Sequence, residues 1–348
     1  MHKLLFLFVL LFTTSNIAAN ELEDRQVISD KVRTLFLLEN FAALDAMASK
    51  YRNNEERTTS GLWKLTLFYA GIDMLPNREV TTKSYWDDLE AKSSGWIKAF
   101  PESPSGYLTH ALILMQHAWM FRGSGWGYQV RPDDWKPFHE YMQKARLVLE
   151  KNKEVASKDP QWYALMVDIA TAQDWDMRQF NALLKEASAR HPYFYQIYFE
   201  AVNYLTPKWH GSKEEIEKFA RKVVGFTRSK EKNGMYARIY WVASQTNYGS
   251  DLFTKSAVVW KEMSKAIDDV IAQYPDQWNI NNFAYFSCLA GDSNKTRQLI
   301  AMIEGKPIVS AWQNMDFFMQ CKAWSEAGIS ASLKSNVLAW NDMRAASQ

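Results

Sequence analysis

The sequence predicts an all-α protein, and three observations support this. Apolar residues recur at helical spacing through most of the chain, and no segment has the alternation typical of a β-strand. Proline restarts the helical pattern at Pro160 and Pro192, which lie 32 residues apart. This spacing is close to the roughly 34-residue period of tetratricopeptide units, which consist of two helices and a turn. The predicted fold is therefore an α-α superhelix of degenerate tetratricopeptide-like helix hairpins.

Residues 159–212 contain one complete unit and the start of the next. The Asp159 side chain is suited to accept an unpaired backbone N–H at a helix start, and Pro160 suits the first helical position, where its missing N–H would have no partner. Two apolar faces follow, separated by a break at 174–176: Trp162, Met166, Ile169 and Ala170, then Phe180, Leu183, Leu184 and Ala187.

The first 19 residues have the pattern of a secretory signal peptide. His2 and Lys3 precede nine apolar residues at 4–12, and the small pair Ala18-Ala19 offers a cleavage site. A membrane anchor is the alternative, but a hydrocarbon core needs about 20 apolar residues. No cysteine follows the cleavage zone to carry a bacterial lipid anchor. We therefore expect an exported mature chain, periplasmic or extracellular, with no membrane span.

Residues 20–348 are expected to form a single continuous helical-repeat domain. The chain has only 14 glycines and 10 prolines and no low-complexity linker. Repeat arrays grow past the usual domain size because each unit touches only its neighbours. The net charge is +2, and losing Lys3 with the signal peptide leaves about +1. No strong field therefore remains to attract nucleic acid or an anionic membrane.

The other helices are expected between turns, prolines and capping residues. The first pair is a hairpin at 21–52 with its turn at 39–40 and an apolar face formed by Val27, Val32, Leu35 and Leu38. A capping box of Ser212 and Glu215 starts a later helix, and Gly291-Asp292 marks another break and cap. Further helices are expected at 59–75, 80–100, 104–122, 134–155, 235–241, 253–274, from 275 onward, at 312–327 and at 333–340.

The longest irregular stretch, residues 122–134, is a candidate binding element. Its three glycines do not make a nucleotide loop, because no strand precedes them and their spacing fits neither the dinucleotide nor the Walker pattern. A loop of this length inside a regular array is either functional or an insertion. It carries the side chains of Arg122, Trp126, Tyr128 and Arg131, which suit a binding surface.

Two further segments carry candidate binding residues. In the corner at 207–212, Lys208, Trp209 and His210 could bind an anionic or sugar-like group, or Trp209 could pack while His210 satisfies a buried carbonyl. In the helix expected at 235–241, the rings of Tyr236 and Tyr240 share a face. Arg238 lies between them and is either a ligand contact or a structural salt-bridge partner.

The two cysteines, Cys288 and Cys321, lie 33 residues apart, about one repeat period. Neighbouring helices could bring them together in an oxidising compartment, and a bridge closing this loop could contribute up to ~4 kcal/mol. Two separate buried thiols are the alternative.

No motif for catalysis, a metal or a cofactor stands out. His110 and His117 share a helix face, but seven residues rise about 10.5 Å, too far for one metal ion. No HExxH motif, Cys/His cluster or Gly-x-Ser-x-Gly elbow occurs. We therefore predict no catalytic residue, no metal site and no cofactor.

Four segments resemble a known family: TSGLWKL with FYAGI at 59–72, PKWHGS at 207–212, GMYARIYW at 234–241 and YPDQWNINNFAYFSCLAGD at 274–292. They are similar to a bacterial family of exported proteins defined only as a domain of unknown function. The resemblance covers about residues 25–325. It implies a tetratricopeptide-like helical array, and it implies no activity, substrate or catalytic residue.

Two functional hypotheses follow from the residues. In the first, the protein is a non-catalytic module that holds a protein or peptide partner on an aromatic-lined face, and several of Trp126, Tyr128, Trp209, Tyr236 and Tyr240 are exposed together. In the second, it binds or hydrolyses cell-envelope carbohydrate, and Lys208, His210 and Arg238 converge. A purely structural role is the third possibility, favoured if no exposed aromatic cluster exists.

Overall fold

The computed structural model describes residues 21–327. The predicted signal peptide at 1–19 and the helix expected at 333–340 lie outside the described residues. The described chain is built from helices, and within it extended backbone pairing is limited to an isolated bridge between Arg57 and Trp63. The all-α class predicted from the sequence is confirmed.

The α-helices of the described chain are α1 (Glu21–Leu37), α2 (Phe41–Asn53), α3 (Lys64–Asp73), α4 (Lys83–Ala99), α5 (Pro104–Arg122), α6 (Pro132–Lys151), α7 (Lys153–Ala156), α8 (Gln161–Ala172), α9 (Met177–Arg190), α10 (Gln196–Tyr204), α11 (Lys213–Glu231), α12 (Gly234–Ala243), α13 (Leu252–Lys255), α14 (Trp260–Gln273), α15 (Gln277–Leu289), α16 (Ser293–Ile300) and α17 (Met315–Ala327). A short 3₁₀ turn, Gly127–Gln129, lies in the loop between α5 and α6, and a π turn, Ser244–Tyr248, follows α12.

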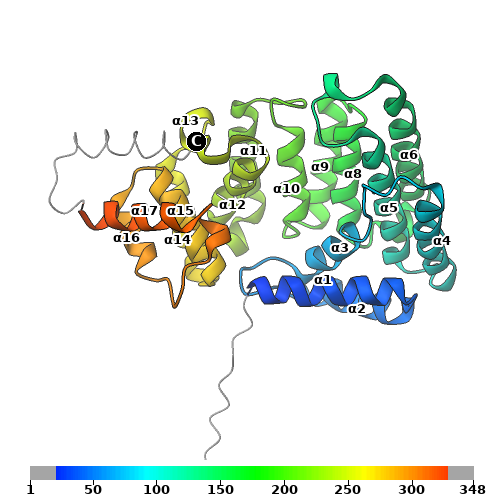
Figure 1. The fold of residues 1–348 in the computed structure, drawn as a ribbon, viewed down its shortest axis with the longest axis horizontal. Helices are drawn as coiled ribbons and strands as arrows, with labels where there is room; N and C mark the ends of the chain where they lie inside the picture. The colour runs from blue at the N-terminus through cyan, green and yellow to red at the C-terminus, as the bar shows by residue number, and fades with distance from the viewer. Residues whose placement is uncertain (1–20, 328–348) are drawn as a thin grey trace, which may run out of the picture.

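Consecutive helix pairs pack side by side, as expected of stacked hairpins. Helix α5 packs on α4 and α6, α8 on α9 and α10, α10 on α12, and α12 on α11 and α14. Figure 1 shows α5, α6, α8, α9 and α10 standing next to one another, while α1 and α2 run horizontally below them. Helix α1 also contacts α15, so the beginning of the described chain reaches the later helices.

Helix starts follow the local capping signals closely. Helix α8 begins directly after Asp159-Pro160, and Asp159 Oδ1 accepts a hydrogen bond from the Gln161 backbone N–H at 2.9 Å. Ser212 caps α11 by accepting from the Glu215 N–H, and Asp292 caps α16 by accepting from the Lys295 N–H. These side chains satisfy backbone donors that a helix leaves unpaired at its start.

Two predicted helix ranges and the predicted apolar face of the first helix are wrong. Helix α3 begins at Lys64, because residues 54–63 form an irregular loop in which Gly61 adopts φ +91°. The helix expected at 253–274 is broken between α13 and α14, where the Ser256 hydroxyl accepts from the Val258 N–H and so replaces helical pairing.

In α1, Val27 and Leu38 are exposed, whereas Ile28, Val32 and Phe36 are buried. The buried three are spaced by four residues and form the stripe that faces α3, where Gly71 closely approaches Val32. Leu38 lies beyond the end of the helix at Leu37.

The 54–63 loop joins the first helices to the later ones. The Ser60 backbone N–H donates to Glu21 Oε2 at 3.1 Å. The Ser60 carbonyl oxygen accepts from Arg238 Nη2 at 2.6 Å and from Asn279 Nδ2 at 3.1 Å. Arg57 Nη1 donates to the Tyr195 hydroxyl at 2.7 Å. The loop therefore links α1, α12 and α15, and reaches the residue that precedes α10.

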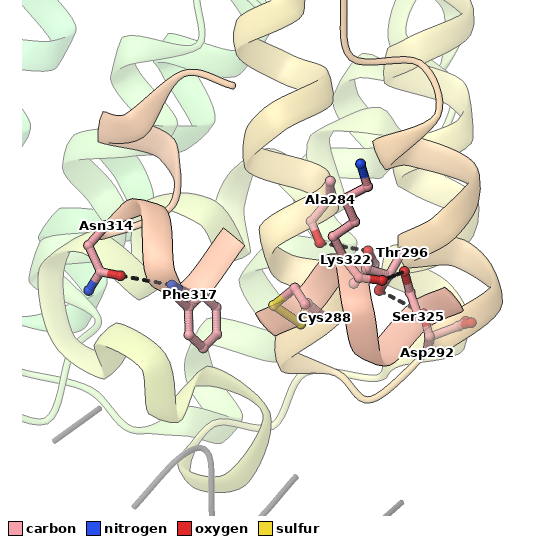
Figure 2. Close-up of a disulfide and its surroundings, with 10 residues drawn as sticks. Ala284, Cys288, Asp292, Thr296, Asn314, Phe317, Lys322 and Ser325 are labelled. Carbon is pink, nitrogen blue, oxygen red and sulfur yellow. Dashed lines mark hydrogen bonds between the residues drawn. A yellow bond between two sulfur atoms is a disulfide. The ribbon is translucent and has the colours of Figure 1, made fainter. Parts of the chain in front are cut away.

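Cys288 of α15 and Cys321 of α17 form a disulfide, with sulfur atoms 2.02 Å apart (Figure 2). The sequence left open a disulfide or two separate buried thiols, and the structure contains the disulfide. Both cysteines are fully buried. Near the start of α17, Asn314 Oδ1 accepts from the Phe317 N–H at 2.8 Å. The bridge fixes α17 to the helix that also contacts the 54–63 loop.

Candidate functional site

A cavity of about 580 Å³, called here the main cavity, lies between the 54–63 loop and helices α1, α3, α10, α12 and α15. Its volume falls within the range of roughly 300–1,000 Å³ typical of ligand pockets. Apolar and aromatic side chains form much of the wall: Leu62, Leu67, Phe199, Trp241, Val242 and Trp278. Ten polar or charged residues complete the wall: Arg25, Ser60, Thr66, Gln196, Glu200, Asn203, Arg238, Gln245, Thr246 and Asn279.

Two tryptophans define the aromatic side of the main cavity. The rings of Trp241 and Trp278 lie 6.1 Å apart and are tilted by 36°. The guanidinium of Arg25 lies 5.3 Å from the centre of the Trp278 ring, and its Nε donates to Glu21 Oε1 at 2.8 Å. These rings therefore provide a firm surface that an apolar or planar group could contact, with a cation at its edge.

Arg238 places a buried guanidinium in the cavity wall. Its side chain is only 3% exposed, and its Nε makes no hydrogen bond. Glu231, whose charge acts on Arg238, lies 3.9 Å from Arg57 in an ion pair of its own. Burial lowers the pKa of Arg238 from its ordinary value, yet an arginine stays charged in proteins. A buried cation without a carboxylate partner is costly, and a ligand anion would relieve that cost.

Asn279 adds a second unsatisfied group to the same wall. It is fully buried, and its amide nitrogen donates to the carbonyls of Ser60 and Tyr274, at 3.1 and 3.0 Å. Its Oδ1 accepts no hydrogen bond within the described chain. Buried polar atoms are almost always paired, so this acceptor lacks the hydrogen-bond donor that such an atom usually has.

A second cavity of about 290 Å³ adjoins the main one and is called here the acid cavity. The two share Thr66, Ala70, Gln196 and Glu200 in their walls, so they lie on either side of the same residues. Three carboxyl groups line the acid cavity: Asp73 of α3, Asp168 of α8 and Glu200 of α10. Arg78 is the cation in this wall.

The carboxyl groups of the acid cavity hold protons unusually tightly. Burial raises the pKa of Glu200 to about 8, with a further contribution from Asp168. Burial and the charge of Asp73 raise the pKa of Asp168 to about 7, and burial also raises the pKa of Asp73. Asp73 is exposed, whereas Asp168 and Glu200 are half-buried. The charged forms are therefore disfavoured unless a cation enters.

Hydrogen bonds organise the edges of the acid cavity. Gln196 Nε2 donates to Glu200 Oε1 at 2.6 Å. Arg78 Nε donates to Gln116 Oε1 at 2.6 Å, and Gln116 Nε2 in turn donates to Asp73 Oδ1. Arg78, the cation in this wall, therefore donates a hydrogen bond to the side-chain amide of Gln116.

Replacing Glu200 with glutamine should stabilise the protein at pH 8 by roughly 1–3 kcal/mol, with a smaller difference at pH 5. Because the folded-state pKa lies above the unfolded one, the parent loses stability as the pH rises from about 4 to about 8. Urea unfolding of both proteins at pH 5 and pH 8 measures the effect. A variant less stable than the parent at pH 8 would contradict it.

The structure brings part of the predicted 122–134 loop together with the 207–212 corner. Lys208 Nζ lies 5.5 Å from the centre of the Trp126 ring. The guanidinium of Arg122 is buried between the rings of Trp119, Trp135 and Trp209, at 5.2, 5.4 and 5.4 Å. Trp126 and Tyr128 are 53% and 83% exposed. Of these predicted residues, Arg122 and the half-buried Trp209 pack, while the other aromatic rings face solvent.

The remaining predicted site residues do not form one cluster in the structure. Tyr236 and Tyr240 are buried, and both hydroxyls donate to Glu217 Oε2, at 2.8 and 2.5 Å. These two rings therefore do not contribute to an exposed aromatic face, because α12 is enclosed by α10, α11 and α14. His210 stacks on Tyr204 with ring centres 4.5 Å apart, and Arg238 lines the main cavity.

The second hypothesis requires Lys208, His210 and Arg238 to converge, and the structure gives them different surroundings. Lys208 contacts the loop after α5, His210 lies 3.5 Å from Asp174, and Arg238 contacts Ser60. His110 and His117 are each bound to α4, through Ser93 and Glu90 at 2.8 Å. Within residues 21–327, no group of three or more His, Cys, Asp or Glu side chains is arranged to hold a metal ion.

Sequence reasoning missed Glu200, Asp168 and Gln161. Asp168 is the acidic residue in a helix whose other side chains are almost all buried, and this was an available signal. A lone carboxylate in such a helix needs a partner, a cavity or a shifted pKa.

In the described part of the chain, no helix has the length and hydrophobicity to span a bilayer. Comparisons with protein families, with curated proteins and with solved structures found no match to this chain.

Proposed function

We propose that this protein is a non-catalytic binding protein that holds a short peptide, or the end of a longer polypeptide, in the main cavity. The observation that carries the proposal is the buried guanidinium of Arg238, which lines the cavity and pairs with no carboxylate of its own. A peptide carboxylate is the group that a guanidinium binds best, through two parallel charge-assisted hydrogen bonds.

The other cavity residues suit the rest of a peptide. Trp241, Trp278 and Phe199 offer surfaces for apolar side chains, and Asn203 and Gln245 offer amide groups that pair with a peptide backbone. Gln245 belongs to the π turn that follows α12, and such turns often occur at functional sites. The combination of rings, amides and a buried cation supports a ligand with apolar side chains, peptide groups and an anionic end.

We also propose that the chain acts outside the cytoplasm, in the periplasm or the extracellular space. The disulfide between Cys288 and Cys321 supports this location, since structural disulfides persist mainly in oxidising compartments. The signal-peptide pattern of residues 1–19 supports it independently. The ligands available to such a protein include peptides released in the cell envelope or taken up from outside.

Replacing Arg238 with methionine should weaken the binding of peptides with a free carboxyl terminus by about 10–100-fold, which corresponds to the loss of a charge-assisted hydrogen bond. The mature chain, residues 20–348, is mixed with a pool of random tetrapeptides, and retained peptides are quantified by native mass spectrometry. Asn279 still donates to the Ser60 carbonyl in the variant, so the 54–63 loop keeps one of its two bonds there.

Two controls make the experiment specific. Peptides with an amidated carboxyl terminus should bind the parent and the Arg238→Met variant equally. Arg178→Met removes an exposed arginine on α9, outside both cavities, and should leave binding unchanged. Retention of cell-envelope oligosaccharides with no retention of peptides would overturn the proposal in favour of a carbohydrate-binding protein.

A further inference from the structure

The wall of the acid cavity contains more carboxyl groups than cationic groups. Its charged and titratable residues are Asp73 and Tyr69 from α3, Arg78 after α3, Asp168 from α8 and Glu200 from α10. Helix α5 contributes Leu112, Gln116 and Trp119, which carry no charge. Three carboxyl groups therefore face one guanidinium, whose Nε is bound to Gln116.

Gln161 provides an independent sign that the acid cavity is made for a ligand. This residue lines the acid cavity and is only 6% exposed, and its side-chain Oε1 is buried and accepts no hydrogen bond within the described chain. A buried amide oxygen without a donor is rare in a finished interior. The missing partner is a hydrogen-bond donor, and the carboxyl groups in the same wall favour a donor with a positive charge.

Glu200 connects this chemistry to the main cavity, because it lines both spaces together with Gln196, Thr66 and Ala70. A ligand in the main cavity can therefore extend one end into the acid cavity. Arg25 and Arg238 line the main cavity, whereas the acid cavity has three carboxyl groups and one arginine, so cationic groups predominate in the first and carboxyl groups in the second. This distribution matches a ligand with an anionic and a cationic end.

We infer that the acid cavity binds an alkylammonium group of the ligand, with Glu200, Asp168 and the Gln161 amide as acceptors for its three N–H donors. The group is either the amino terminus of a peptide or the side chain of a lysine. This inference rests on the proposed peptide-binding function, which supplies the rest of the ligand.

Proton balance follows from the state of the carboxyl groups. In the empty cavity Glu200 retains its proton at neutral pH, because burial and neighbouring carboxyl groups raise its pKa. Entry of an ammonium stabilises the carboxylate, so the Glu200 O–H bond breaks and the proton passes to solvent while the ammonium keeps its own three protons. Glu200 therefore releases up to one proton per ligand near pH 7, Asp168 releases a further fraction because its pKa is raised to about 7, and few protons are released above pH 9.

The test uses peptide pools and a simple amine as probes. The mature chain is offered the random tetrapeptide pool with free amino termini and the same pool after N-acetylation, with lysine-free and lysine-containing versions of each. Butylamine is titrated separately at pH 7 in two buffers of different ionisation enthalpy, and the difference in binding heat counts the protons released. Glu200→Gln removes the charge, and Glu154→Gln on α7, an exposed carboxylate outside both cavities, is the matched control.

We expect at least a tenfold preference for peptides that carry an amine. In Glu200→Gln this preference should be lost and the proton release should fall by the share of Glu200, whereas Glu154→Gln should retain both. If N-acetylated lysine peptides are retained and lysine-free ones are not, the ammonium comes from the side chain; the reverse dependence on the free terminus identifies the amino end. Should Glu200→Gln fail to fold, Asp168→Asn tests the same cavity.

The outcomes separate this inference from the proposed function. Equal retention of free and acetylated lysine-free peptides, unchanged by Glu200→Gln, would overturn the ammonium subsite and leave peptide binding intact. Proton-linked binding of butylamine that depends on Glu200, without retention of any peptide, would support the subsite and overturn the peptide function. No binding of either probe would overturn both.

Discussion

Replacing Asp159 with alanine should lower the free energy of unfolding by about 3–5 kcal/mol, the loss expected when one member of a buried ion pair is removed. Asp159 is fully buried, and its Oδ2 accepts from Arg52 Nη1 and from the Tyr69 hydroxyl, both at 2.9 Å. Its Oδ1 also caps α8. One carboxylate thus joins α2, α3 and α8, and its removal leaves a mostly buried guanidinium, a phenol and a backbone N–H without their acceptor.

A double-mutant cycle in urea unfolding measures this coupling. We expect Arg52→Met to cost much less in the Asp159→Ala background than in the parent, because the guanidinium has already lost its partner. The free energy of unfolding of Asp159→Asn should lie between those of the parent and of Asp159→Ala. The asparagine amide oxygen can still cap α8, but it carries no charge. Additive effects of the two substitutions would show that Asp159 stabilises the fold through its cap alone.

Replacing both Cys288 and Cys321 with serine should lower stability by about 3–4 kcal/mol, the chain-entropy value for closing a 33-residue loop. The loop contains α16 and much of α17, and the disulfide restricts these residues in the unfolded chain (Figure 2). Guanidinium unfolding with and without a reducing agent measures the effect.

The double variant serves as its own redox control. A reducing agent should lower the stability of the parent by nearly as much as the double substitution does. It should leave the stability of the Cys288→Ser, Cys321→Ser protein unchanged. A parent whose unfolding midpoint is insensitive to complete reduction would contradict the prediction.

Local chemistry explains which parts of the fold could be predicted. Ser212, Asp159 and Asp292 cap helices through backbone groups two or three residues away, so their roles are visible in the sequence. The partners of Asp159 are not visible, because Arg52 and Tyr69 lie 107 and 90 residues from it along the chain. Helical spacing identifies a buried face, but not what that face meets.

The candidate site was harder to predict for the same reason. Arg238 was identified, but Glu200 and Asp168 were not, since each is a single acid on its own helix and the cavity exists only where α3, α8 and α10 meet. The exposed rings of Trp126 and Tyr128 were expected from their glycine-rich loop. Tyr236 and Tyr240 share a face as predicted, yet a helix enclosed on several sides buries that face as well.

The 54–63 loop has a consequence for how the chain is made. Ser60 is bound by Arg238 and Asn279, which follow it by 178 and 219 residues. Early helices can form as soon as they are synthesised, but the loop lacks these partners until almost four-fifths of the polypeptide has emerged. Contacts this distant slow folding, because a long stretch of chain must be ordered before they form. Unlike an array that can be shortened one unit at a time, this molecule should gain or lose its main cavity as a whole.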